Sequence, residues 1–385
     1  MARAERAFDP VNMRRRRVVA LLLLFLVVVL WRPARAHVRA ASLLARFSDP
    51  SATGGLAGAA RHPVEVRDEP LAGARARLYL PTDVPRPPGV VIVHGVHWKG
   101  IDEPRLQRFA RTVAASGVAV MTPEVRELCD YRIDPASVDT IGLTARAFAE
   151  QLGVDRVGLV GLSFAGGLSL VAASDRRFEG ALEFVVAIGA HDDLGRVLRF
   201  FVTDDAPRPD GTTFHVHAHD YGTVVLEYAH AEDFFPPEDV DAARDTLRLV
   251  LHEDLDAARE RAKALSTASR EKMQRILAHD AVSLVSELMA EIARLEPRFA
   301  AVSPSAHVAS LRVPAFVLHG AGDTLIPPSE AEWLARDIPR SMLRADLVSA
   351  AIEHVNLESD TSLIDELALV HFMGDVLDAA DDERR

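Results

Sequence analysis

The sequence predicts an α/β fold: a mostly parallel, doubly wound sheet that carries an inserted, mainly helical segment and follows an N-terminal hydrophobic stretch. Seven short apolar runs rich in β-branched residues alternate with stretches of helical periodicity, and this alternation is typical of βαβ units. About 125 residues separate the fifth run from the sixth, whereas a βαβ unit needs roughly thirty. The long interval therefore predicts an insertion.

Composition excludes several classes of protein. The 385 residues carry 44 basic and 56 acidic side chains, a formal charge of −12, and ten of the arginines lie in the first 46 residues. The rest of the chain is therefore strongly acidic and repels nucleic-acid phosphates, so we expect no nucleic-acid partner. The single Cys129 excludes an intramolecular disulfide. The strong preference for arginine over lysine is typical of a GC-rich bacterial genome.

A basic segment, residues 1–17, leads into an apolar stretch, residues 18–36. Fourteen uninterrupted apolar residues, Val18 to Trp31, follow four arginines, and as a helix they span only ~21 Å of a hydrocarbon core of ~30 Å. That length and the following Ala34-Arg35-Ala36 are typical of a cleaved signal peptide. We favour a retained membrane anchor, because the run is unusually apolar and Arg32 can extend it by snorkelling. Either alternative places the rest of the chain on the extracytoplasmic side.

Residues 37–62 are expected to form a linker. They contain Gly54, Gly55 and Gly58 among alanines and serines and show neither helical nor alternating apolar periodicity, as in a flexible tether. We expect the folded domain to start near Pro63.

The elements of the expected sheet follow in order along the chain. Strands are predicted at residues 77–80, 90–93, 118–121, 157–160, 182–188, 315–318 and 343–348. Helices are predicted at residues 104–116, 137–152, 164–174, 330–337 and 362–377. These elements give a core in two parts, residues 63–190 and 307–385, with the insertion at residues 191–306.

The insertion has two unlike halves. Its first part, residues 204–221, is rich in Pro, Gly and His and predicts a loop. Later, apolar residues recur at steps of three and four, which places them on one face of a helix: Val282, Val285, Leu288, Met289, Ile292 and Leu295. We therefore expect a mainly helical cap over the carboxyl edge of the sheet.

One segment carries the strongest chemical signal. A buried-strand pattern, Arg156 to Val160, runs into Gly161-Leu162-Ser163-Phe164-Ala165-Gly166-Gly167 and then into an apolar helix. It closely resembles the nucleophile elbow of the α/β-hydrolase fold, in which a tight strand-to-helix turn exposes a serine hydroxyl. The turn needs small neighbours because strand and helix backbones approach closely there. Ala165 departs from the Gly-x-Ser-x-Gly pattern by one methyl group.

The resemblance implies two partners for Ser163. In this family an acidic residue after a late strand and then a histidine follow the serine along the chain. The apolar strand at 315–318 ends in a His-Gly-x-x-Asp segment that supplies Asp323, and the loop after the last strand supplies His354. His354 is expected to act as base and Asp323 to orient it. Asp192 and Asp193 are a rival position for the acid, which we place behind Asp323.

The resemblance also implies an oxyanion hole. An apolar strand at residues 90–93 ends in His94-Gly95-Val96, and in similar hydrolases this loop supplies one backbone N–H while the residue after the nucleophile supplies the other. The expected donors are Val96 and Phe164. His94 precedes the serine in the chain, so we expect it to pack beside the hole rather than to act as base.

These features predict a serine hydrolase that cleaves an ester or related acyl bond of a small molecule through an acyl-enzyme on Ser163, without a cofactor. Two alternatives stay open: acyl transfer or amide hydrolysis on the same residues, and a catalytically silent hydrolase fold that serves as an envelope binding protein. The resemblance covers residues 63–190 and 307–377. A serine at the elbow argues against Asp-nucleophile chemistry, and Cys129 lies elsewhere. Substrate-binding residues and oligomeric state are left open.

A histidine cluster in the insertion is a weaker signal. His215, His217 and His219 alternate and precede Asp220, so on a strand the three imidazoles would share one face, as metal ligands can. Their spacing does not match an established metal motif. We expect a polar cap loop and no metal there. The sequence has no phosphate-binding glycine loop and no dinucleotide fingerprint.

Overall fold

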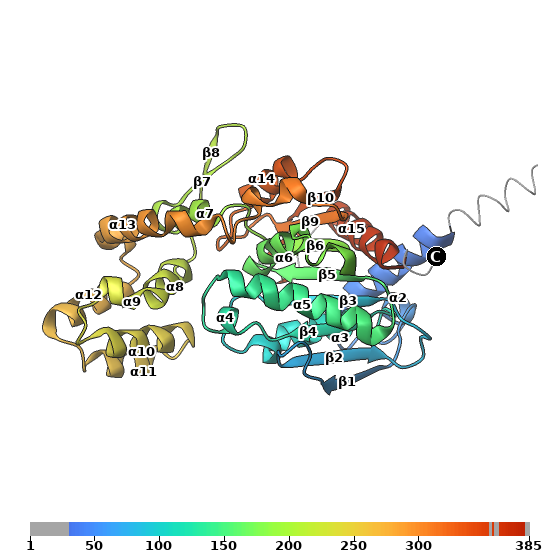
Figure 1. Ribbon diagram of the computed structural model, residues 1–385, viewed down its shortest axis with the longest axis horizontal. Coiled ribbons are helices and arrows are strands. Elements are labelled where there is room, and N and C mark those ends of the chain that lie inside the picture. Colours follow the sequence, from blue (N-terminus) through green and yellow to red (C-terminus); the bar gives the residue numbers. More distant parts are fainter. Residues whose placement is uncertain (1–30, 354–355, 358–361, 382–385) are drawn as a thin grey trace, which may run out of the picture.

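The computed structural model describes residues 31–353, 356–357 and 362–381 (Figure 1). Its centre is a sheet of eight strands in the order β1-β2-β4-β3-β5-β6-β9-β10. The strands are β1 (Val64–Asp68), β2 (Ala76–Pro81), β3 (Gly89–Val93), β4 (Ala119–Pro123), β5 (Val157–Leu162), β6 (Leu182–Ile188), β9 (Ala315–Gly320) and β10 (Leu343–Ser349). β2 pairs antiparallel with β1 and β4, and every other pair is parallel. The predicted mostly parallel sheet is confirmed.

The burial of the strands explains which of them the sequence reveals. Every residue of β3, β5 and β9 is buried, because helices cover both faces of a parallel sheet, and such strands are continuous apolar runs. β1 was not predicted. It is an edge strand of sequence VEVRD in which no residue is fully buried, so its short alternation is hard to separate from a loop.

Two helical layers enclose the sheet. On one face lie α5 (Pro135–Leu152) and α6 (Phe164–Ser174), which pack with the first hydrophobic cluster. On the other lie α3 (Pro104–Ala114), α15 (Leu363–Asp381) and the helical residues 31–48, which share the second cluster. The remaining core helices are α2 (Gly55–Gly58), α4 (Arg126–Cys129) and α14 (Ser329–Asp337). Figure 1 shows α15 beside the N-terminal helix.

The N-terminal helix corrects the expectation of a linker over residues 37–62. Residues 31–48 are helical and bury Ala36, Ala40 and Leu43 in the second cluster. Arg39 is also buried, and its guanidinium donates to a carboxylate oxygen of Asp381 at 2.6 Å. The expectation of no helical periodicity was also wrong, because Ala36, Ala40 and Leu43 recur at steps of four and three. Small alanines and a paired, buried arginine give little hydropathy contrast, which hides this spacing.

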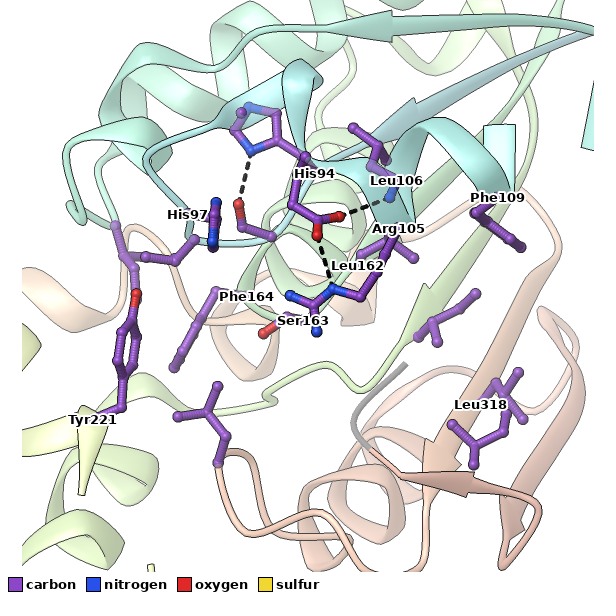
Figure 2. Close-up of a pocket in the computed structure, with 18 of the residues that line it drawn as sticks. His94, His97, Arg105, Leu106, Phe109, Leu162, Ser163, Phe164, Tyr221 and Leu318 are labelled. Carbon is purple, nitrogen blue, oxygen red and sulfur yellow. Dashed lines mark hydrogen bonds and ion pairs between the residues drawn. The ribbon is translucent and has the colours of Figure 1, made fainter. Parts of the chain in front are cut away.

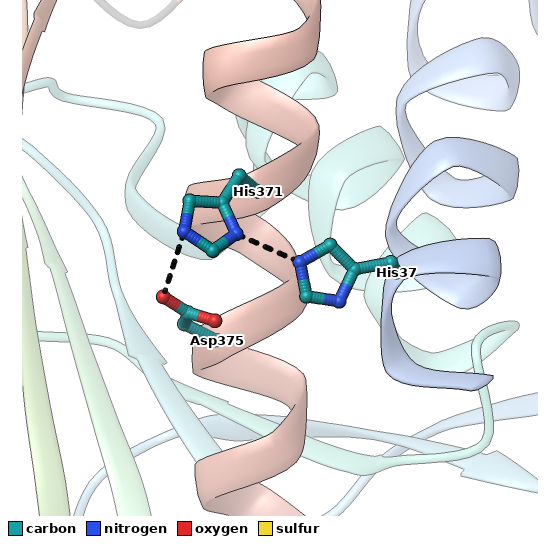
Figure 3. Close-up of side chains that lie close together, drawn as sticks. All are labelled: His37, His371 and Asp375. Atoms are coloured by element: carbon teal, nitrogen blue, oxygen red, sulfur yellow. Dashed lines mark hydrogen bonds and ion pairs between the residues drawn. The ribbon is translucent and has the colours of Figure 1, made fainter. Parts of the chain in front are cut away.

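A contact between two histidines also joins this helix to α15 (Figure 3). His37 Nε2 lies 2.8 Å from His371 Nδ1, and His37 Nδ1 lies 2.6 Å from the carbonyl oxygen of Pro33. On the far side of its ring, His371 Nε2 lies 3.7 Å from a carboxylate oxygen of Asp375. A Cβ atom at Gly374 would come within 2.9 Å of the His37 ring, so that glycine lets the helices approach.

The expected anchor, residues 18–36, falls mostly outside the described residues, which begin at Trp31. Among the helices that the structure describes, none combines the length and the hydropathy that crossing a bilayer requires. The basic segment, residues 1–17, lies outside them as well.

The insertion between β6 and β9 is mainly helical, as predicted, and Figure 1 shows its helices gathered on the left, away from the sheet. It comprises α7 (Leu194–Thr203), α8 (Tyr221–Ala229), α9 (Ala231–Phe234), α10 (Val240–Leu251), α11 (Leu255–Ala262), α12 (Thr267–Leu277) and α13 (Ala281–Phe299). The expected loop at 204–221 contains a hairpin, β7 (Asp205–Pro207) with β8 (Thr213–His215). The predicted face of α13 buries Leu288, Ile292 and Leu295, but Val282 at its start is 85% exposed.

A buried carboxyl in α8 makes the stability of the cap depend on pH. The pKa of Glu227 is raised from its ordinary value of 4.5 to about 8, chiefly by burial; Lys272 opposes the shift and Glu287 adds to it. Between pH 4.5 and 8 the unfolded chain therefore releases a proton that the folded chain keeps, so stability falls as pH rises through this window.

We expect Glu227→Gln to stabilise the chain above pH 8, by on the order of a few kcal/mol at most, and to have little effect below pH 4.5. Thermal unfolding of both proteins across this pH range measures the difference. Comparison with the wild type cancels the contribution of other titrating groups. A difference in stability that does not change with pH would contradict the assignment.

Candidate active site

Ser163 lies on a strained turn between β5 and α6. Its backbone angles are φ 56° and ψ −134°, a combination that costs a non-glycine residue free energy and recurs at functional sites. The turn is held on both sides: the Ser163 N–H donates to the Ile188 carbonyl at 2.8 Å, and the Gly166 N–H donates to the Ser163 carbonyl at 2.8 Å. These bonds fix the serine at the carboxyl end of the central strands.

Small residues make the turn possible. A Cβ atom at Gly161 would lie 2.3 Å from the Ala165 carbonyl oxygen, and one at Gly166 would lie 2.7 Å from the Ala190 Cβ. At Gly167 it would lie 2.2 Å from the His191 ring. Ala165 itself is fully buried, so the methyl group by which this sequence departs from the usual pattern is accommodated.

The loop after β3 approaches the serine closely. A Cβ atom at Gly95 would lie 3.3 Å from the Ser163 Cβ. His94 holds this loop: Nδ1 lies 2.7 Å from the Gly95 carbonyl oxygen (Figure 2). Its Nε2 accepts the Val125 N–H at 3.0 Å. Burial lowers the pKa of His94, so the ring stays neutral. The geometry agrees with the expectation that His94 packs beside the hole.

The two expected oxyanion donors, Val96 and Phe164, both line the cavity that contains Ser163. Within the described part of the chain, neither backbone N–H donates a hydrogen bond to another residue. Unpaired N–H groups beside a serine hydroxyl can serve a developing oxyanion, because they are oriented before the reaction begins.

Asp323 lies just beyond β9 and is 2% exposed. Its Oδ1 accepts the N–H groups of Leu325 and Ile326 at 2.9 and 3.0 Å, which fixes the carboxylate. Its Oδ2 would lie 3.5 Å from a Cβ atom placed at Gly189. Gly189 follows Ile188, whose carbonyl oxygen accepts the Ser163 N–H. The carboxylate therefore sits at the end of the sheet that presents Ser163, with the end of β6 between them.

The two rival acids, Asp192 and Asp193, form hydrogen bonds with other residues. Asp192 Oδ2 accepts from the Arg196 guanidinium at 2.9 Å, and Asp193 Oδ1 accepts the Arg196 N–H at 2.7 Å as the N-cap of α7. Their own N–H groups donate to Glu330 Oε2 at 2.8 and 3.0 Å. Burial, with the Glu330 carboxylate, raises the pKa of Asp192 to about 7. This network joins the start of the cap to α14, and it occupies the carboxylate oxygen of Asp192 that faces Arg196.

We expect Asp323→Asn to slow ester turnover by about 10⁴, because an amide would hold the base in the wrong tautomer. Asp192→Asn serves as the matched control, since it makes the same change at a buried aspartate, and we expect turnover within a few-fold of wild type. Steady-state kinetics on both variants measure this. A large loss in the Asp192 variant together with normal turnover in the Asp323 variant would reverse the assignment.

His354, the expected base, lies outside the described residues. The strands that flank it in the sequence are described: β11 (Ile352–Glu353) pairs antiparallel with β12 (Asn356–Leu357) after the end of β10. Its role remains a prediction.

Ser163 opens into an apolar cavity of about 170 Å³ (Figure 2). Its walls come from the N-terminal helix, the loop after β3, α3, the strand ends, the start of the cap and α15. Sequence reasoning missed most of them, including Leu43, Leu44, Phe47, Phe109, Phe201, Tyr221 and Met373. These apolar residues are spread over 330 positions of the sequence, so no local pattern indicates that they share a cavity. Only the helical spacing of those in the N-terminal helix could have been recognised.

The histidines of the cap hairpin do not converge. His215 Nδ1 lies 2.6 Å from Asp205, and His217 Nδ1 lies 3.1 Å from Asp204; the Asp204 carboxylate raises the pKa of His217. Two other groups among the described residues have atoms close enough to share a metal ion: His37 with His371 and Asp375, and His230 with Asp233 and Glu291. Arg294 pairs with both carboxylates of the second group.

No protein-family model matches this chain, and no curated protein sequence does. Solved structures that resemble it include dipeptidyl peptidase 4 of Porphyromonas gingivalis, with 12% identity, a TM-score of 0.47 and coverage of 82% of this chain and 36% of that one. A haloalkane dehalogenase loop variant from Bradyrhizobium elkanii has 16% identity and a TM-score of 0.44, covering 84% and 100%. A variant of the esterase rPPE has 17% identity and a TM-score of 0.43, covering 82% of each chain. This chain spans little more than a third of that dipeptidyl peptidase.

Proposed function

We propose that this chain, which has the α/β-hydrolase fold, is a serine hydrolase that cleaves an ester or related acyl bond through an acyl-enzyme on Ser163. The observation that carries the proposal is the strained elbow of Ser163, whose side chain lines an apolar cavity. Beside it are two backbone N–H groups that have no hydrogen-bond partner among the described residues. A strained backbone persists only where the surrounding structure enforces it. In this chain the enforced conformation presents a nucleophile.

The proposed reaction has two halves. Ser163 Oγ attacks the acyl carbon, its proton passes to His354, and the N–H groups of Val96 and Phe164 hold the carbonyl oxygen as it becomes an anion. The C–O bond of the ester then breaks, and the alcohol leaves with the proton from His354. Water adds to the acyl-enzyme by the same route, which releases the acid and restores the serine. Asp323 orients His354 and stabilises its charged form.

A panel of acyl donors tests the reaction class. The full chain is assayed with esters, the corresponding amides, and esters in the presence of added alcohols as acyl acceptors. We expect ester hydrolysis to exceed amide hydrolysis, and water to be the main acceptor. Predominant amide cleavage or transfer to the alcohol would assign the same serine to a different reaction, and no turnover of any donor would contradict the proposal.

We also propose that residues 18–36 are kept as a membrane anchor, with the hydrolase domain on the extracytoplasmic side. The packing of the N-terminal helix supports this. Ala36, the last residue of the candidate cleavage site, is 1% exposed, and Arg35 donates to Asp381 at 2.9 Å. Cleavage after Ala36 would remove these contacts from the folded domain, whereas a retained segment keeps them.

We expect the full-length chain to remain with membranes through washes at high salt. Salt screens ion pairs but leaves the burial of an apolar segment intact. Fractionation followed by N-terminal sequencing checks this. A soluble envelope form that begins at His37 would contradict retention but not export, and a full-length form in the cytosol would contradict both.

A further inference from the structure

The cavity extends to two sides of Ser163. On one side it is lined by the cap, through Leu198, Phe201 and Val225, which belong to the first hydrophobic cluster or pack against it. On the other it is lined by helices of the opposite layer: Leu43, Leu44 and Phe47 of residues 31–48, Phe109 of α3, and Leu369 and Met373 of α15. We call these the cap arm and the helix arm. Figure 2 shows Tyr221 and Phe109 on opposite sides of the serine.

The helix arm is lined by apolar side chains, several of which belong to the buried second cluster. Its floor is formed by Leu162, Ile188 and Leu318, all less than 10% exposed. Beyond Met373 a second, smaller apolar cavity of about 30 Å³ continues between the sheet and the same helices. Protein interiors are normally packed without such gaps, and apolar cavities stay dry and accept apolar ligands.

The polar groups lie at the rim of the helix arm. Arg105 and Glu103 line the same cavity as Ser163, and Arg105 Nε donates to a carboxylate oxygen of Glu103 at 2.8 Å (Figure 2). A ligand in this arm is therefore hydrocarbon along its length and polar only at the end that meets Ser163.

We propose that the helix arm is the acyl-chain subsite and that the substrates are esters of long, unbranched aliphatic acids. This assignment rests on the proposed function. In an acyl-enzyme reaction the alcohol leaves first while the acyl group stays bound until water attacks, so an arm lined by buried apolar side chains suits the acyl group. The cap arm carries the polar rings of His97 and Tyr221, neither fully buried, and suits the departing alcohol.

The N-terminal helix is thereby part of the site. Arg39 and His37 fasten it to α15, and Leu43, Leu44 and Phe47 face the arm. The segment that follows the expected anchor therefore contributes to substrate selectivity.

Acyl-chain selectivity tests the assignment on the full chain, with p-nitrophenyl butyrate, octanoate and dodecanoate below their critical micelle concentrations. For the wild type we expect kcat/KM to rise with chain length, by up to about fourfold per methylene while the arm fills. Leu44→Trp obstructs the helix arm, so it should lower kcat/KM for dodecanoate at least about tenfold more than kcat/KM for butyrate. Leu44→Ala, which lengthens the arm, should move the optimum to a longer ester.

Val225→Trp is the matched control, since Val225 is also a partly buried aliphatic residue that lines the cavity, but in the cap arm. It should change kcat/KM for all three esters by the same factor. The assignment would be overturned if the wild type preferred butyrate, or if only the Val225 variant changed the dependence of kcat/KM on chain length. In either case Ser163 would remain the nucleophile. If no ester is hydrolysed by the wild type, the proposed function itself fails.

Discussion

We expect Ser163→Ala to abolish acyl-enzyme formation and to lower ester turnover by on the order of 10⁴ to 10⁶ in kcat. The hydroxyl oxygen is the only heavy atom removed, and in the proposed reaction it is the atom that forms the bond to the acyl group. The backbone turn is kept, because alanine and serine bear similar strain at φ 56°. Steady-state kinetics and mass measurement of the trapped acyl-enzyme follow the loss.

The control for this variant is its stability. We expect the thermal unfolding midpoint to stay within a few degrees of wild type, since the bonds that hold the turn involve only backbone atoms of Ser163. Unimpaired turnover by a folded Ser163→Ala protein would exclude this serine as the nucleophile.

The second large effect is expected for His354→Ala. Nucleophile and base act as a unit, so losing the base costs nearly as much as losing the serine, again on the order of 10⁴ to 10⁶ in kcat. Added imidazole should restore part of the lost rate, because a small base can occupy the vacated space. The readout is the rate with and without imidazole.

His94→Ala separates the base from a positioning histidine. His94 is neutral, and hydrogen bonds at both ring nitrogens hold it in the loop, so we expect a smaller loss in its variant and no rescue by imidazole. Rescue of the His94 variant, with normal turnover in the His354 variant, would assign the base to His94.

The sequence predicted the sheet well for a physical reason. Parallel strands buried on both faces, such as β3, β5 and β9, must be apolar without interruption, and runs of this kind are visible without a structure. The elbow was visible for a similar reason, since only small side chains fit at Gly161, Gly166 and Gly167. In both cases local sterics constrain neighbouring residues, and the constraint appears as a local pattern.

Features that depend on distant residues could not be predicted in this way. The N-terminal helix is fixed by contacts such as Arg39 with Asp381, 342 positions away. The surroundings of the rival acid Asp192 depend on the ion pair of Arg196 with Glu330, 134 positions apart. Burial and partners decide such questions, and neither is contained in a short stretch of sequence.

The most direct test of the central claim is to treat the full chain with a fluorophosphonate and locate the adduct by peptide mass. A phosphonylating reagent reacts rapidly only with a serine that is activated by its surroundings. The account predicts a single adduct, on Ser163, that is absent from the Ser163→Ala protein. A folded wild-type chain that takes up no reagent, or an adduct on another residue, would contradict it.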